Sequence, residues 1–173
     1  KVLLFKASFI VSGRRTYADM FLALAKDSAL HNNQLYFYDF NMKANAIINE
    51  KNRLFVSGYF GRDVFAFQDM VDMRWGNHTY TVRLNTVLNE KLFSNTSFIY
   101  SNYDYEINTS QDAGSFGDFS WKSNIRDIGL KYDLNYFMNP NNSIKFGVHA
   151  YYRTINPGTI SSQTSNFSYD MED

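Results

Sequence analysis

The chain of 173 residues contains no cysteine, which excludes disulfide bonds, thiolate zinc sites and a cysteine nucleophile. Proline and glycine are also scarce, with 2 and 9 residues, so the chain is neither collagen-like nor of low complexity. No apolar run approaches the ~18 residues that a membrane-spanning helix needs. The 17 basic and 17 acidic side chains cancel, so the net charge gives no sign of a nucleic-acid partner. If this protein contacts a membrane, the sequence predicts that it does so through strands.

Aromatic residues are abundant, with 16 Phe, 13 Tyr and 2 Trp. Together with a hydrophobic fraction of 45%, they argue against a disordered chain. The length fits about one domain. The sequence therefore describes an ordered domain with a large amount of apolar surface to cover.

Four segments alternate cleanly between apolar and polar residues, at 36–48, 80–88, 128–136 and 143–153. In each of them the even positions are mainly apolar and the odd positions mainly polar, as where Leu130 and Tyr132 flank Lys131. A period of two places the two sets on opposite faces of a strand. These segments are therefore predicted to be strands with one apolar face.

Three further segments bring the predicted number of strands to seven. The first, at about 3–11, alternates more loosely, and those at 53–63 and 93–106 carry aromatics on both faces, so their orientation stays open. Short turns rich in Asn and Pro are predicted at 49–52, 89–91 and 139–142, with long loops at about 13–34, 64–77, 107–123 and 156–173. A short amphipathic helix is expected to begin at Thr16 in the first loop. The sequence thus predicts an all-β, antiparallel up-and-down meander over a single segment, 1–173.

Such a meander fits either a small soluble barrel or sandwich, or part of a transmembrane β-barrel. The predicted strands run to roughly 10–14 residues, which is longer than the ~5–6 typical of globular proteins and enough to cross a bilayer. Short turns alternating with long loops, and a polar face with both signs of charge, are also typical of outer-membrane barrels. We therefore expect a transmembrane barrel.

Seven strands would leave open edges in hydrocarbon, where unpaired backbone groups are costly, and bacterial single-chain barrels have even strand numbers. We therefore expect an arc of a larger barrel. The acidic residues 169–173 are predicted to be a loop rather than a terminal strand, which favours a piece of a longer protein.

Several short phrases occur in an order and spacing that resemble a known family. They are Ser12-Gly13-Arg14-Arg15-Thr16-Tyr17, the residues from Leu35 to Asn41 with Lys43, Asn52-Arg53-Leu54, Ser57-Gly58-Tyr59, Gly61-Arg62-Asp63, Trp75-Gly76-Asn77 and Lys91-Leu92-Phe93-Ser94-Asn95. Over about residues 8 to 155 the chain resembles the barrel region of TonB-dependent outer-membrane receptors of the Bacteroidetes type. The resemblance implies a 22-stranded barrel with an N-terminal plug and a TonB-contacting segment, neither of which is visible in this chain. It also implies uptake of a scarce nutrient, such as a metal chelate, cobalamin, an oligosaccharide or a peptide.

The expected partners are outer-membrane lipid, TonB through a plug outside this chain, and a small nutrient. Ligand contacts are expected from the long loops and from one polar, lumen-facing row: Asp39, Asn41, Lys43, Arg83, Lys131, Asp133, His149 and Arg153. The alternative role of these side chains is a charge network that stabilises the wall. The three histidines are scattered without metal-ligand spacing, and no nucleophile, base and orienting group occur together. We therefore expect no enzymatic activity, no catalytic residue, no metal site and no cofactor.

Two rival functions remain open from the sequence alone. The first is a complete small β-barrel or sandwich that acts as a soluble carrier or a surface-adhesion module. The second is an outer-membrane barrel enzyme, which lacks support from any catalytic set. Solubility without detergent would favour the first, and loss of activity on substituting one lumen acid would favour the second.

Overall fold

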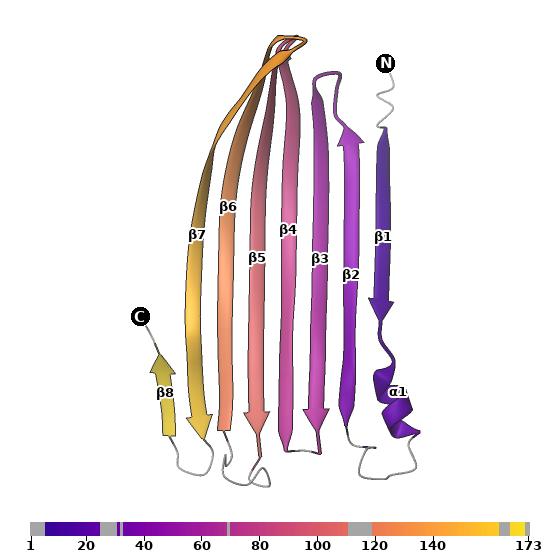
Figure 1. Ribbon diagram of the computed structural model, residues 1–173, viewed down its shortest axis with the longest axis vertical. Helices are drawn as coiled ribbons and strands as arrows, with labels where there is room; N and C mark the ends of the chain where they lie inside the picture. The colour runs from indigo at the N-terminus through magenta and orange to yellow at the C-terminus, as the bar shows by residue number, and fades with distance from the viewer. Residues whose placement is uncertain are drawn as a thin grey trace.

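The chain forms one open antiparallel sheet in which each strand pairs with the next along the sequence (Figure 1). The computed structural model describes residues 6–24, 31, 33–68, 70–110, 119–162 and 167–171. The elements are β1 (Ala7–Arg15), α1 (Ala18–Ala23), β2 (Gln34–Ile47), β3 (Asn52–Phe67), β4 (Val71–Asn89), β5 (Leu92–Thr109), β6 (Phe119–Asn139), β7 (Asn142–Ser162) and β8 (Phe167–Met171). The predicted all-β meander is confirmed, and the sheet does not close on itself.

Three tight turns join β2 to β3, β4 to β5 and β6 to β7 at the end of the sheet drawn uppermost in Figure 1, which we call the turn end. The same side-chain hydrogen bond stabilises each turn. The side-chain oxygens of Asn49, Asn89 and Asn139 accept hydrogen bonds from the backbone N–H two residues ahead, at 3.0, 2.9 and 3.1 Å. An asparagine that bonds its own turn in this way favours a sharp reversal. The predicted short turns are thus present where the asparagines are.

The opposite end of the sheet, which we call the loop end, differs from the prediction at 64–77. That segment is no loop, because β3 continues to Phe67 and β4 begins at Val71. Gln68 adopts a positive φ of 48° in this reversal, and its backbone N–H donates to the side-chain oxygen of buried Asn33 at 2.7 Å. The first loop holds a short helix, α1, which begins at Ala18 instead of the predicted Thr16 and lies near the start of β2 (Figure 1).

The other predicted loops are also shorter than expected. The strands β5 and β6 occupy both ends of the predicted loop 107–123, and most of the residues between them lie outside the described part of the chain. Within 156–173, β7 continues to Ser162 and β8 covers Phe167–Met171. The prediction that 169–173 is a loop is therefore wrong for Tyr169 to Met171, and the sheet has an eighth, short strand that pairs with the end of β7.

The pairing register gives the sheet two consistent faces. From β2 to β7, even-numbered residues lie opposite even-numbered ones, as in Phe40 with Phe60 and Val82 with Phe98. The exceptions are register shifts next to the β4–β5 and β6–β7 turns and at the loop end of the β6–β7 pair. We call the face with the even-numbered side chains of these strands the even face and the other the odd face. The register also gives the orientation of the two segments that the sequence left open, 53–63 and 93–106, because it places Val56 and Phe98 on the even face.

An uncharged, mainly apolar band covers the turn-end half of the even face. We define this apolar band as the even-numbered residues of 40–46, 54–60, 80–88, 92–100, 128–136 and 144–152. None of these described positions is Asp, Glu, Lys or Arg. Nothing within the described residues covers the band, and Leu130 and Val148 are 54% and 71% exposed.

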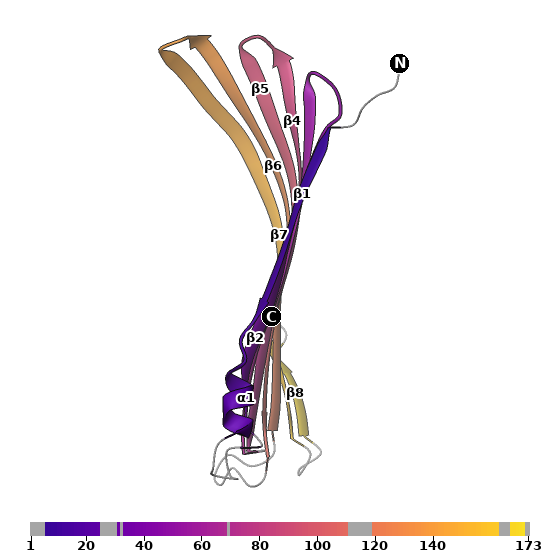
Figure 2. The ribbon, with the colours of Figure 1, turned by 90° about the vertical axis from the view of Figure 1, so that its right-hand side faces the viewer.

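The sheet is a single twisted layer with almost no dry core (Figure 2). Among the described residues, Val64 is the only buried hydrophobic side chain. No helix in the described ranges is both long and apolar enough to cross a bilayer. An unclosed sheet whose large apolar side chains stand exposed is consistent with an arc of a larger barrel.

Candidate ligand-binding face

All eight sequence-predicted ligand residues lie on the odd face. The register places them there together, because Asp39, Lys43, Arg83 and their counterparts in β6 and β7 all have odd numbers and pair with odd-numbered partners. They do not form a single site. Cross-strand contacts divide most of them into small groups along the sheet.

The first group lies between β1 and β2. Arg14 Nε donates to Asp39 Oδ2 at 2.5 Å, and Asn41 Nδ2 donates to the other oxygen of the same carboxylate at 3.4 Å. The Arg14 guanidinium also lies over the ring of Phe37, at 5.2 Å from its centroid. Asp39 is only 9% exposed, so its charge is matched within the wall.

The second group is centred on Asp133 in β6. Its two carboxylate oxygens contact His149 Nε2 at 3.1 Å and Lys131 Nζ at 3.3 Å. Asp133 is paired with Gly147 on β7, where a Cβ would lie 2.8 Å from Asp133 Oδ1 and 2.5 Å from a backbone oxygen. A glycine at this position therefore leaves room for the carboxylate to contact both His149 and Lys131.

Three predicted residues lie outside these groups. Arg83 Nε donates to the buried hydroxyl of Ser97 at 3.3 Å, in the same cross-strand row as Lys131 and His149. Arg153 forms a two-pronged ion pair with Asp127, with both bonds at 2.7 Å. Lys43 lies exposed beside a recess of about 500 Å³ near Arg83.

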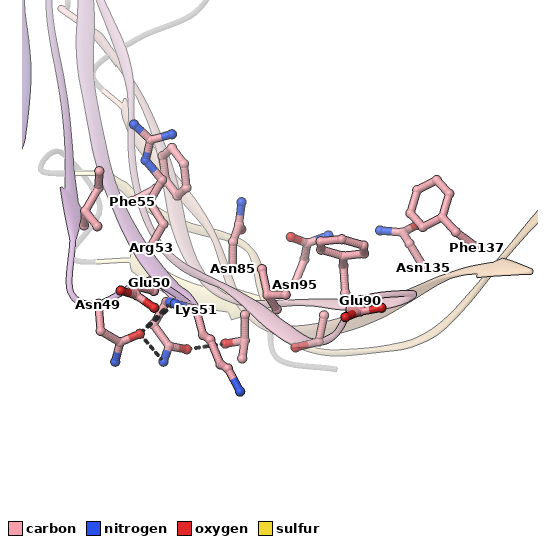
Figure 3. A pocket seen from close by; sticks show the side chains of 16 residues that line it. Asn49, Glu50, Lys51, Arg53, Phe55, Asn85, Glu90, Asn95, Asn135 and Phe137 are labelled. Atoms are coloured by element: carbon pink, nitrogen blue, oxygen red, sulfur yellow. Dashed lines mark hydrogen bonds between the residues drawn. The ribbon is translucent and has the colours of Figure 1, made fainter. Parts of the chain in front are cut away.

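A recess of about 780 Å³ lies at the turn end, on the odd face. Figure 3 shows Asn85, Asn95 and Asn135 pointing into the concave side of the curved sheet, with Phe137 beside them and Arg53 facing from the neighbouring wall. The side-chain oxygen of Asn85 is buried without a hydrogen-bond partner. The recess thus offers amide groups and charged side chains of both signs beside aromatic rings.

The described side chains of the odd face can bind a ligand by hydrogen bonding and charge. The acids described above lie against Arg, Lys or His partners. Over the described ranges, no group of three or more His, Cys, Asp or Glu side chains could hold a metal ion. No family model, curated protein or solved structure matches the chain. The assignment of a function therefore depends on the sequence pattern and on the arrangement of the side chains.

Sequence reasoning missed two parts of this face. It did not single out the three asparagines of the turn-end recess, although Asn85 and Asn95 follow the same odd parity as the predicted row. It also did not pair Arg14 with Asp39, or Asp127 with Arg153, because such partners depend on the register between strands rather than on the period within one strand.

Proposed function

We propose that this chain is part of the wall of an outer-membrane β-barrel that takes up a nutrient, of the TonB-dependent receptor kind. In this assignment the even face contacts lipid acyl chains and the odd face lines the lumen. The protein is a binding and transport component, with no enzymatic activity and no cofactor.

The apolar band is the observation that carries the proposal. It crosses six adjacent strands without a charged residue, and most of its large side chains are exposed. Exposed apolar surface of this extent is rare in soluble monomers and marks a membrane or protein interface. Along β6 and β7 the band runs from Ile128 to Tyr136 and from Ile144 to Tyr152, close to the ~9–11 tilted residues that cross a bilayer.

The odd face behind the band supports the lumen assignment. In the same part of the strands it carries Lys131, Asp133, His149 and Arg83, held by the cross-strand contacts described above. Polar and charged side chains face the interior of transmembrane β-barrels. Figure 3 supports this orientation, because the odd-face side chains at the turn end point into the concave side of the sheet.

The expected partners follow from the proposal. Lipid covers the apolar band, a nutrient meets the odd face and the loops, and TonB acts through a plug domain supplied outside this chain. The resemblance of residues 8 to 155 to the barrel region of such receptors agrees with these roles. The identity of the nutrient stays a matter for experiment.

Fractionation of cells that make the protein tests the membrane assignment. We expect the protein in the outer-membrane fraction, released only by detergent, because the apolar band requires an acyl-chain environment. Recovery in the soluble fraction, with a cooperative melt and no detergent, would instead support a soluble carrier or adhesion module.

Uptake assays test the transport assignment. Cells that lack the gene should fail to grow when a ferric chelate, cobalamin, an oligosaccharide or a peptide is the limiting nutrient, and the intact gene should restore growth. Growth that is unchanged across this panel would contradict nutrient uptake while leaving the barrel assignment intact.

A further inference from the structure

The strands are much longer than the apolar band. Both β6 and β7 have 21 residues, about twice the ~9–11 tilted residues that span a bilayer. At ~3.3 Å per residue, the remainder of β6 extends some tens of ångströms beyond the band toward the loop end. The chemistry of both faces changes in this remaining part.

On the even face, apolar residues give way to ion pairs. Arg62 Nη1 donates to Asp104 Oδ2 at 2.8 Å, and Lys122 Nζ lies 3.2 Å from Glu106 Oε1. Arg74 and Asp72 form a further two-pronged pair in β4. Exposed pairs of this kind suit water, whereas charged side chains on a lipid face destabilise a transmembrane barrel, most of all near the bilayer centre.

The odd face changes in the opposite direction. Trp75, Tyr105 and Trp121 form an aromatic row across β4, β5 and β6, with ring centroids 6.5 and 5.9 Å apart. Trp121 Nε1 donates to the backbone oxygen of Pro157 at 3.3 Å, which fixes its ring. Toward the loop end of the same strands, the even face therefore changes from apolar to charged, and the odd face changes from polar to aromatic.

Aromatic rings on the even face mark the position of this exchange. Tyr80 and Tyr100 stack at 6.2 Å, with His78 at 5.9 Å from Tyr100. In β2 and β3, Tyr38 lies 6.0 Å from Phe60. Rings with a polar tip collect where hydrocarbon meets water.

We infer that only the turn-end half of the sheet lies in hydrocarbon, and that the loop-end half stands in water outside the bilayer as a β-wall with an aromatic inner surface. The even face thus meets acyl chains up to Tyr80 and Tyr100, and water beyond them. The inference rests on the proposed membrane function and adds to it the depth at which the strands leave the lipid.

Cysteine labelling tests this boundary, because the chain has no cysteine of its own and each variant carries one thiol. Two matched pairs share a strand and a face: Arg74→Cys with Val82→Cys on β4, and Lys122→Cys with Leu130→Cys on β6. Membranes that contain each variant are treated with a maleimide coupled to polyethylene glycol, which does not enter the bilayer. A thiol in hydrocarbon does not form the reactive thiolate, so we expect the loop-end member of each pair to react at least ~10-fold faster.

The outcomes separate the inference from the function that it rests on. Shielding of all four thiols in membranes would overturn the inference but leave the barrel wall in place. Rapid labelling of Val82→Cys and Leu130→Cys would overturn the membrane function itself. Equal labelling of the four variants in dodecyl sulfate is the control for thiol reactivity.

A measurement on the unsubstituted protein gives an independent check. The two tryptophans of this chain, Trp75 and Trp121, lie on the odd face of the loop-end half. In vesicles of phosphatidylcholine with brominated acyl chains, we expect their fluorescence to match that in unmodified lipid. Strong quenching by bromine would place these rings in hydrocarbon and overturn the inference.

Discussion

Gly158 combines an unusual backbone with a crowded position. Its φ of 150° is one that L side chains rarely adopt, and a Cβ there would lie 1.8 Å from Nε1 of Trp121. The glycine follows Pro157 where the register between β6 and β7 shifts, so that Ile160 pairs with Trp121 on the odd face. Gly158 therefore allows β7 to shift its register against β6 while Trp121 stays in the aromatic row with Trp75 and Tyr105.

We expect Gly158→Ala to destabilise the protein by about 1–3 kcal/mol, because it adds both backbone strain and a clash with Trp121. Urea unfolding in detergent or lipid would measure the loss. Gly58→Ala is the matched control, since the nearest atom to its added Cβ is a Tyr80 ring carbon at 3.5 Å, an ordinary contact. Equal losses for the two variants would contradict the role given to Gly158.

We expect the stability of the loop-end half to decrease in acid because of Glu106. A hydrogen bond from Asn108, together with contact to Lys122, lowers the pKa of this carboxyl from its usual 4.5. A lowered pKa in the folded state stabilises the fold above the unfolded pKa, and this stabilisation is lost as the pH falls through the folded pKa.

The matching prediction concerns Glu106→Gln. The variant should be less stable than the parent at pH 7, by about 1 kcal/mol or less because the group is near the surface. The difference should disappear in acid, once the parent carboxyl is protonated. Unfolding free energies compared at pH 7 and below the folded pKa would check this, and a difference that persists in acid would contradict it.

At the scale of the strand, the alternation along β2 predicts opposite effects for neighbouring positions. Met42 lies in the apolar band, and Asn41 lies on the odd face beside Asp39. In the proposed barrel, Met42→Arg should cost about 2–4 kcal/mol, whereas Asn41→Arg should be far better tolerated because position 41 would face the lumen. Folding yields of the two variants in lipid test the assignment, and equal yields would refute it.

Along the strands, apolar and charged residues swap between even and odd positions, which explains why some strands were difficult to predict from the sequence. In 64–77 the charged residues Asp72 and Arg74 fall on even positions while Met73 and Trp75 fall on odd ones, the reverse of the pattern in 80–88. A period-two pattern that inverts within one strand resembles a loop that mixes charges and aromatics. In 93–106 the same inversion puts Tyr103 and Tyr105 on odd positions. The other odd-position aromatics, Phe55, Tyr59 and Phe93, lie behind the apolar band, so they obscured the alternation for a separate reason.

At the scale of the whole molecule, the sequence predicted the meander, its turns and the common face of all eight candidate residues. These properties depend on the period within each strand and on asparagine turn chemistry, both of which are local. It did not predict which side chains meet, such as Asp133 with His149, or the recess formed by Asn85, Asn95 and Asn135. Those contacts depend on the register and curvature of the sheet, which arise only when strands pair.

The neighbour-to-neighbour order of the sheet has a consequence for how such a wall changes over evolution. Among the described strands, extensive contacts join only consecutive ones, so each hairpin depends mainly on the one before it and the one after it. A duplicated or deleted hairpin would preserve the direction of every other strand. The width of the sheet could thus change in steps of two strands without other changes to the remaining strands.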